Sequence, residues 1–116
     1  MSIQIKRIYE NVTDDDGKRV LVDRIWPRGV SKEKAQLDEW LKEVAPSTEL
    51  RKEFNHDPER FSEFKKHYKQ ELNENPVQQE AFNKLLKWSN KELVTLLYAS
   101  KDETYNHAQV LKKLLK

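Results

Sequence analysis

The pattern of apolar and polar positions along the chain predicts three strands. Residues 3–9 (IQIKRIY) alternate between apolar and polar side chains and are rich in isoleucine, as expected for a strand. Residues 20–26 (VLVDRIW) are predicted to form the second strand. Residues 93–100 (LVTLLYAS) are almost continuously apolar, which is typical of a strand covered on both faces.

Segments in which apolar residues recur at helical spacing follow the second and third predicted strands. Asp57-Pro58 and Asn75-Pro76 each combine a capping residue with proline at the first helical position, so each marks the start of a helix. Ser100 to Glu103 match a capping box, S-x-x-E, which predicts that the last helix starts there. The predicted helical segments are 31–46 in part, 48–54 with Ser47 as its cap, the helix after Pro58, 76–89, and a last helix from about residue 101.

This order of elements indicates a single α/β domain over residues 1–116, with a small, mostly parallel sheet of about three strands flanked by four to five helices. The link between the first two strands is too short for a usual parallel crossover, so they are either antiparallel neighbours or parallel strands separated by another. If the second and third strands are parallel, their carboxyl ends share one edge of the sheet. Open α/β sheets bind ligands at that edge.

Composition narrows the possible functions. The chain has 22 Lys and Arg against 20 Asp and Glu, and this near balance does not favour a nucleic-acid-coating surface. It contains no cysteine, which excludes disulfides, thiolate catalysis and cysteine-held metal centres. No apolar run has the length of a signal peptide or a membrane span, so we expect a cytoplasmic protein without membrane contact. No motif implies a cofactor.

The loops after the second and third strands carry the first candidate residues. Arg24, Arg28 and Lys101 would form a cationic site beside the start of the last helix, where arginine suits a carboxylate or phosphate. Trp26 could stack on a planar ligand, but packing is the preferred interpretation. The alternative for Arg24 is an ion pair with Asp23 or another acid at the edge of the core.

Residues 45–61 supply a second group of candidates. Arg51 would clamp an anion, with Ser47 one helical turn away, and His56 would act as an acid, a base or a hydrogen-bond donor. The structural alternatives are a helix cap for Ser47, a surface charge for Arg51 and a turn residue for His56. The remaining candidates are Asp102 as a proton-transfer group, and Asn106 and His107 as ligand contacts.

One helical group has the spacing of a metal site. His67 lies four residues from both Glu63 and Glu71, but these residues flank the predicted apolar stripe and are better explained as a solvated ion-pair face. We therefore predict no metal site.

Three long blocks resemble a known family. DRIWPRGVSKE, DEWLKEVAPSTELRKEFNHDPERFSEFKKHY and VTLLYASKDETYNHAQVL are similar to the YeaO-like branch of the family called "domain of unknown function 488". The resemblance implies a compact α/β domain in a bacterial or archaeal cytoplasmic protein, and little about function. Some wider relatives carry cysteines thought to be reactive, but this chain has none, so a thiol mechanism cannot be transferred. The positions that match the family's polar pattern are Arg24, Arg28, Ser47, Arg51, His56, Lys101, Asp102, Asn106 and His107.

Three functional hypotheses follow. The first is a protein that binds a small anion at the carboxyl edge of the sheet, with the option of metal-independent and thiol-independent catalysis by His56 and Asp102. The second is a nucleic-acid or protein binding module in which the same arginines contact phosphates and Trp26 stacks on a base. The third is purely structural, with the arginines held in internal ion pairs. The sequence leaves the ligand, the reaction and the oligomeric state open.

Overall fold

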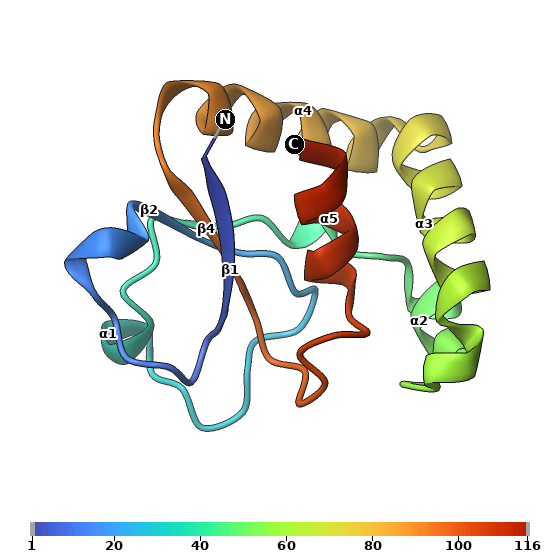
Figure 1. Ribbon diagram of the computed structural model, residues 1–116, viewed down its shortest axis with the longest axis horizontal. Helices are drawn as coiled ribbons and strands as arrows, with labels where there is room; N and C mark the ends of the chain where they lie inside the picture. Colours follow the sequence, from blue (N-terminus) through green and yellow to red (C-terminus); the bar gives the residue numbers. More distant parts are fainter. Residues whose placement is uncertain (1, 116) are drawn as a thin grey trace.

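The computed structural model describes residues 2–115 as an α/β domain built on one parallel sheet (Figure 1). The strand order is β1-β4-β2-β3, and every pairing between neighbours is parallel. The first two strands are therefore parallel and separated by β4, the second of the two arrangements expected. The predicted fold class is confirmed, and the short β3 adds a fourth strand. The strands are β1 (Ile3–Arg7), β2 (Lys18–Leu21), β3 (Glu39–Trp40) and β4 (Val94–Tyr98).

Most of the predicted helix starts are confirmed by their caps. The Ser47 hydroxyl accepts a hydrogen bond from the backbone N–H of Leu50, and Asn75 accepts from the first turn of its helix. Asp57 caps a 3-10 turn (Pro58–Arg60) that leads directly into the next helix. The helices are α1 (Lys32–Ala35), α2 (Thr48–Phe54), α3 (Phe61–Glu74), α4 (Pro76–Lys91) and α5 (His107–Leu115), with further 3-10 turns at Asp14–Asp16 and Lys42–Val44.

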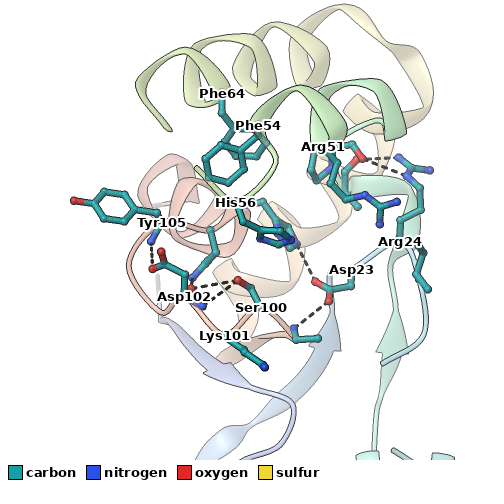
Figure 2. A pocket seen from close by; sticks show the side chains of 16 residues that line it. Asp23, Arg24, Arg51, Phe54, His56, Phe64, Ser100, Lys101, Asp102 and Tyr105 are labelled. Carbon is teal, nitrogen blue, oxygen red and sulfur yellow. Dashed lines mark hydrogen bonds and ion pairs between the residues drawn. The ribbon is translucent and has the colours of Figure 1, made fainter. Parts of the chain in front are cut away.

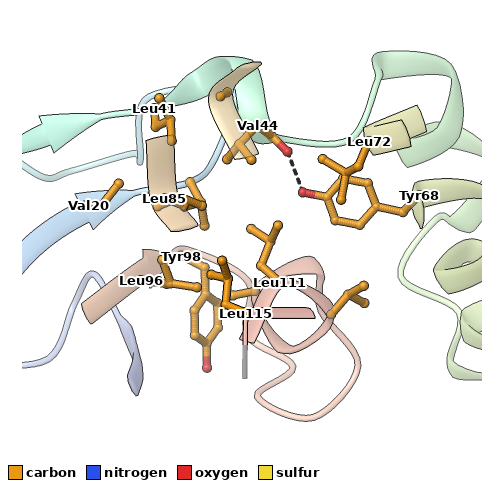
Figure 3. Packing of buried hydrophobic residues seen from close by; sticks show 14 of the residues in the cluster. Val20, Leu41, Val44, Tyr68, Leu72, Leu85, Leu96, Tyr98, Leu111 and Leu115 are labelled. Atoms are coloured by element: carbon orange, nitrogen blue, oxygen red, sulfur yellow. Dashed lines mark hydrogen bonds between the residues drawn. The ribbon is translucent and has the colours of Figure 1, made fainter. Parts of the chain in front are cut away.

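The main hydrophobic core lies between one face of the sheet and the longer helices (Figure 3). Val20 of β2 and Leu96 of β4 pack with Leu85 of α4 and Leu111 of α5, and all four side chains are fully buried. Tyr68 of α3 enters the same core and donates a hydrogen bond to the Val44 carbonyl. Burial raises the pKa of the Tyr68 hydroxyl well above its usual value, so this hydroxyl remains a donor.

The opposite face of the sheet carries a smaller apolar cluster and a buried polar network. Leu21 and Leu97 pack there against Ala35 of α1, which Figure 1 shows on the side away from α3 and α5. Beside them, Arg19 and Asp16 form an ion pair in which both side chains are at most 4% exposed. This face is therefore covered rather than open to solvent.

The second strand is shorter than predicted. It ends at Leu21, whereas the pattern predicted strand over residues 20–26. Val22 still donates to the Leu97 carbonyl, but the next N–H on the β4 side, that of Ala99, donates to the Asp23 carboxylate. A side chain thus replaces the backbone acceptor and stops the ladder, so Arg24 lies in a loop and not in the strand.

The prediction that the last helix starts near residue 101 is wrong. Helix α5 begins at His107, and the side chain of Asn106 accepts from the N–H of Gln109 as its cap. The Asp102 carboxylate accepts from the N–H groups of Thr104 and Tyr105, which holds a turn in place of a first helical turn. Lys101 consequently does not stand at a helix N-terminus.

The segment 31–46 is helical only in part, as predicted, because its middle pairs with the sheet. Asp38 donates its N–H to the Arg19 carbonyl, and the N–H of Leu41 donates to the Leu21 carbonyl. Leu37 packs in the smaller cluster, whereas Leu41 packs in the main core. These side chains have helical spacing in the sequence, but they pack in two different hydrophobic cores.

Candidate functional site

A cavity of about 590 Å³ opens where β2 and β4 end at the carboxyl edge of the sheet. Two of its walls are the loops that follow these strands, and the others come from α2, α3 and the start of α5 (Figure 2). This volume is within the range of small-molecule binding pockets. Its lining residues are Asp23, Arg24, Ile25, Ala45, Pro46, Arg51, Phe54, His56, Phe64, Ala99, Ser100, Lys101, Asp102, Tyr105, Asn106 and His107.

Most of the residues singled out in the sequence meet in this cavity, although they come from segments far apart in the chain. Those that line it are Arg24, Arg51, His56, Lys101, Asp102, Asn106 and His107. The structure does not place Arg28, Ser47 or Trp26 among the lining residues. The loop after β2, the α2 region and the loop after β4 thus contribute to one cavity.

The three excluded residues have other contacts. Arg28 is exposed, and its carbonyl accepts from the Tyr9 hydroxyl. Ser47 caps α2 and binds the Glu71 carboxylate through its hydroxyl and its backbone N–H. The indole N–H of Trp26 donates to the Val30 carbonyl, and its ring packs edge-on against Trp40 with centroids 5.3 Å apart. The packing interpretation therefore describes Trp26, and the capping interpretation describes Ser47.

Arg24 is fixed in the cavity wall by backbone carbonyls. Its Nε donates to the Pro46 carbonyl at 3.3 Å and its Nη2 to the Ala45 carbonyl at 2.9 Å. Both bonds use one side of the planar guanidinium group. Nη1 has no partner among residues 2–115 and is not sealed from solvent. One edge of a preoriented cation therefore remains available.

The cations of the cavity have no acidic partners. Within residues 2–115, no carboxylate oxygen lies within 4.0 Å of a charged nitrogen of Arg24, Arg51 or Lys101. Arg28, outside the cavity, likewise has no such ion pair in this part of the chain. The structural hypothesis of internal ion pairs is therefore wrong for these residues. It describes Arg19 instead, which the sequence did not single out.

Asp23 and His107 form a close acid–imidazole pair at the base of the cavity. The Asp23 Oδ2 accepts from the Ala99 N–H at 3.0 Å, and Oδ1 lies 3.0 Å from the His107 Nε2. The same Nε2 lies 3.1 Å from the Val22 carbonyl. Both neighbours are acceptors, so Nε2 carries a proton. Its N–H is directed at the carbonyl, which leaves the buried Oδ1 of Asp23 close to the imidazole but without a hydrogen bond.

The other polar residues shape the wall. Asp102 holds the turn before α5, and buried Asn106 both caps α5 and donates to the Asp102 carbonyl. His56 is exposed, has a positive φ of 54°, and lies beside the ring of Phe54. Both carboxylates of the cavity accept backbone N–H groups, Asp102 from Thr104 and Tyr105, and Asp23 through Oδ2 only.

Metal binding finds no support in the described part of the chain. Over residues 2–115, no three His, Asp or Glu side chains gather as a metal site. His67 lies 3.7 Å from Glu53, and Glu71 binds Ser47 and Gln78. The residues 2–115 also contain no helix that is long and apolar enough to span a membrane.

Sequence reasoning missed the aromatic part of the site and the role of Asp23. Phe54 and Phe64 stack with centroids 4.5 Å apart and line the cavity, and Tyr105 also lines it, on the side opposite Arg51 (Figure 2). In the sequence, Phe64 was visible only as part of an apolar stripe. The signal for Asp23 was its position immediately beyond the buried part of the second strand.

Comparison with known proteins identifies relatives but no function. The uncharacterized protein YeaO of Escherichia coli strain K12 is 45% identical over 116 residues, which cover 100% of this chain and 98% of the relative. The uncharacterized protein Rv3073c of Mycobacterium tuberculosis strain H37Rv is 42% identical over 113 residues, covering 97% of this chain and 92% of the relative. No solved structure matches the chain significantly. Residues 2–116 match the family model described as "Inactive DUF488-N3 subclade", and the chain therefore belongs to this family.

Proposed function

We propose that this protein binds a small anionic molecule, bearing a carboxylate or a phosphate, in the cavity at the carboxyl edge of its sheet. The observation that carries the proposal is the state of the charges. Arg24, Arg51 and Lys101 have no acidic partner among residues 2–115, whereas Asp23 and Asp102 are both engaged by backbone N–H groups. The lining also holds three cationic side chains, Arg24, Arg51 and Lys101, against two carboxylates, Asp23 and Asp102, so the net charge of these side chains is positive, which favours an anion.

Binding is better supported than catalysis. The description of the family as inactive favours a binding role, and Asp102, a candidate proton-transfer group, is occupied in capping a turn. The chain has no cysteine to act as a nucleophile. A cytoplasmic location stays a prediction.

The alternative of a nucleic-acid binding module has less support. It requires Trp26 to stack on a base, but this indole is engaged by the Val30 carbonyl and by Trp40. It also requires Arg28 to act with the other arginines, and Arg28 lies outside the cavity. Oligonucleotide binding that weakens steeply with salt would favour this alternative over ours.

The test is a thermal-shift screen of the full chain with inorganic phosphate, nucleotides, monocarboxylates and dicarboxylates. At least one of these anions should raise the melting temperature in a concentration-dependent manner. Arg51→Ala should weaken the binding of that anion by about tenfold or more, because a charge-assisted hydrogen bond is lost. Arg51 is exposed, so its replacement should leave the unliganded melting temperature almost unchanged.

Arg28→Ala is the matched control. It removes the same charge from an exposed arginine that does not line the cavity, so the affinity should change little. Equal losses in both variants would indicate general charge attraction and would contradict the proposed site. No shift with any of the anions would also contradict it.

A further inference from the structure

We infer that the ligand is an amphipathic monocarboxylate, with its carboxylate at Arg24 and Arg51 and an apolar, preferably aromatic, body against the opposite walls. This inference rests on the proposed anion-binding function and names the ligand class. It follows from the division of the cavity into a cationic side and an apolar side. In Figure 2, Arg24 and Arg51 project from one side of the pocket, and Tyr105 lies on the opposite side.

The cavity is too large and too apolar for a simple ion. Its volume is about 590 Å³, and most of its lining surface is apolar. The apolar part is made by the buried Phe54 and Phe64, the exposed Ile25 and Tyr105, and small side chains. An inorganic anion would leave this surface in contact with water, whereas an apolar body would cover it.

Two large side chains of the cavity lining are exposed to solvent. Ile25 is 58% exposed and Tyr105 is 40% exposed. The Tyr105 ring packs edge-on against Phe61 with centroids 5.3 Å apart, so one side of the ring is fixed while the rest faces solvent. A ligand body that covered these side chains would remove them from water and would add contacts with the aromatic ring of Tyr105.

The charge pattern matches one carboxylate better than a phosphate group. Two backbone carbonyls hold one edge of the Arg24 guanidinium group, and the other edge is free. A free guanidinium edge has the geometry that pairs with a planar carboxylate. Asp23 and Asp102 line the same cavity and would repel a multiply charged anion. The chain has only two glycines, and neither Gly17 nor Gly29 lines the cavity, so there is no glycine-rich backbone cradle for phosphates.

The test uses probes that separate the head from the body. NMR or calorimetric titrations of the full chain would compare 3-phenylpropionate with propionate, which lacks the ring, and with 3-phenylpropanamide, which lacks the charge. We expect 3-phenylpropionate to bind about tenfold or more tightly than either comparison compound. Inorganic phosphate and ADP would serve as the phosphate probes, and we expect both to bind more weakly than 3-phenylpropionate.

Two matched pairs of variants locate the two ends of the ligand. Tyr105→Ser should weaken the binding of 3-phenylpropionate about fivefold and leave the affinity for propionate unchanged. Tyr9→Ser is the control at an exposed tyrosine that does not line the cavity, and it should change neither affinity. Arg51→Ala should weaken the binding of 3-phenylpropionate but not that of 3-phenylpropanamide. Arg28→Ala should leave the affinity for both compounds unchanged.

The outcomes separate this inference from the proposed function. Equal affinity for propionate and 3-phenylpropionate would overturn the inference. Tighter binding of phosphate or ADP, lost in Arg51→Ala, would also overturn it but would leave the proposed anion site standing. Equal affinity for the amide and the carboxylate, or no binding of any probe, would overturn the inference. The proposed function would fail as well only if no anion of the thermal-shift screen raised the melting temperature.

Discussion

The fold lowers the pKa of the Asp16 carboxyl group. Its carboxylate accepts hydrogen bonds from Lys6, Thr13 and Arg19, and its side chain is 3% exposed. Burial alone would raise the pKa of Asp16, but the hydrogen bonds from Lys6, Thr13 and Arg19 outweigh burial and lower it from 3.8 to about 2. The charged form is therefore the form that the native state requires.

This shift predicts acid sensitivity. Because the pKa of Asp16 is lowered by folding, its contribution to stability is complete above about pH 4 and is lost as the pH falls through about 2. The loss should be about 2 kcal/mol in the free energy of unfolding. Urea unfolding across this pH range would measure it. Asp16→Asn should remove this part of the pH dependence and should cost about 3 kcal/mol at neutral pH, because Arg19 stays buried without its counter-ion.

Asp15→Asn is the control for this prediction. Asp15 is the exposed neighbour of Asp16, so its replacement should leave both the neutral-pH stability and the acid dependence nearly unchanged. Identical pH profiles for the wild type and Asp16→Asn would contradict the assignment.

The two glycines of the chain offer a further comparison between single residues. Both have positive φ, 64° for Gly17 and 78° for Gly29, so alanine is strained at either site. A Cβ at Gly17 would lie 2.4 Å from the Leu93 carbonyl oxygen, whereas a Cβ at Gly29 would meet nothing within 4 Å. Gly29→Ala should cost about 1 kcal/mol and Gly17→Ala at least about 2 kcal/mol more, measured by denaturant unfolding. Equal costs would show that backbone strain alone matters.

At the scale of elements, the start of α5 determines one wall of the cavity. Asn106 caps this helix and ties it to the Asp102 carbonyl, so the preceding turn holds Tyr105 at the rim. Asn106→Ala should lower the free energy of unfolding by about 1–2 kcal/mol. Ser100→Ala should cost less, because the Ser100 hydroxyl accepts only a local N–H from Asp102. A larger cost for Ser100→Ala would indicate a helix start at Ser100 after all.

The helix starts that the sequence predicted correctly are those with a local cause. Asp57 and Asn75 cap turns whose geometry their own side chains and the following prolines determine. The capping motif at Ser100 is equally local, but Asp102 satisfies the neighbouring N–H groups in a turn and the helix begins later. Two local solutions competed here, and the turn held by Asp102, followed by the Asn106 cap, took the place of a first helical turn at Ser100.

For the whole molecule, the sequence predicted that the candidate residues gather at the sheet edge, but not the aromatic lining of the cavity there. The apolar run of β4 and the arginine-containing loop after β2 were enough to bring Arg24, Lys101 and Asp102 together. The aromatic wall forms because α2 packs on α3. Whether the cations have ion-pair partners depends on the position of every acidic side chain around them. Both depend on contacts between distant segments, which hydrophobic periodicity does not record.

The position of β4 in the sheet also has a consequence for how the chain folds as it is synthesised. The strand at the centre, which pairs with both β1 and β2, is the last one in the sequence. A nascent chain therefore carries β1 without any partner strand, and β2 without its partner β4, until residues 94–98 have left the ribosome. Helices α3 and α4, with their local contacts, can form earlier. The sheet and the pocket at its edge should therefore appear together, in one late step of folding.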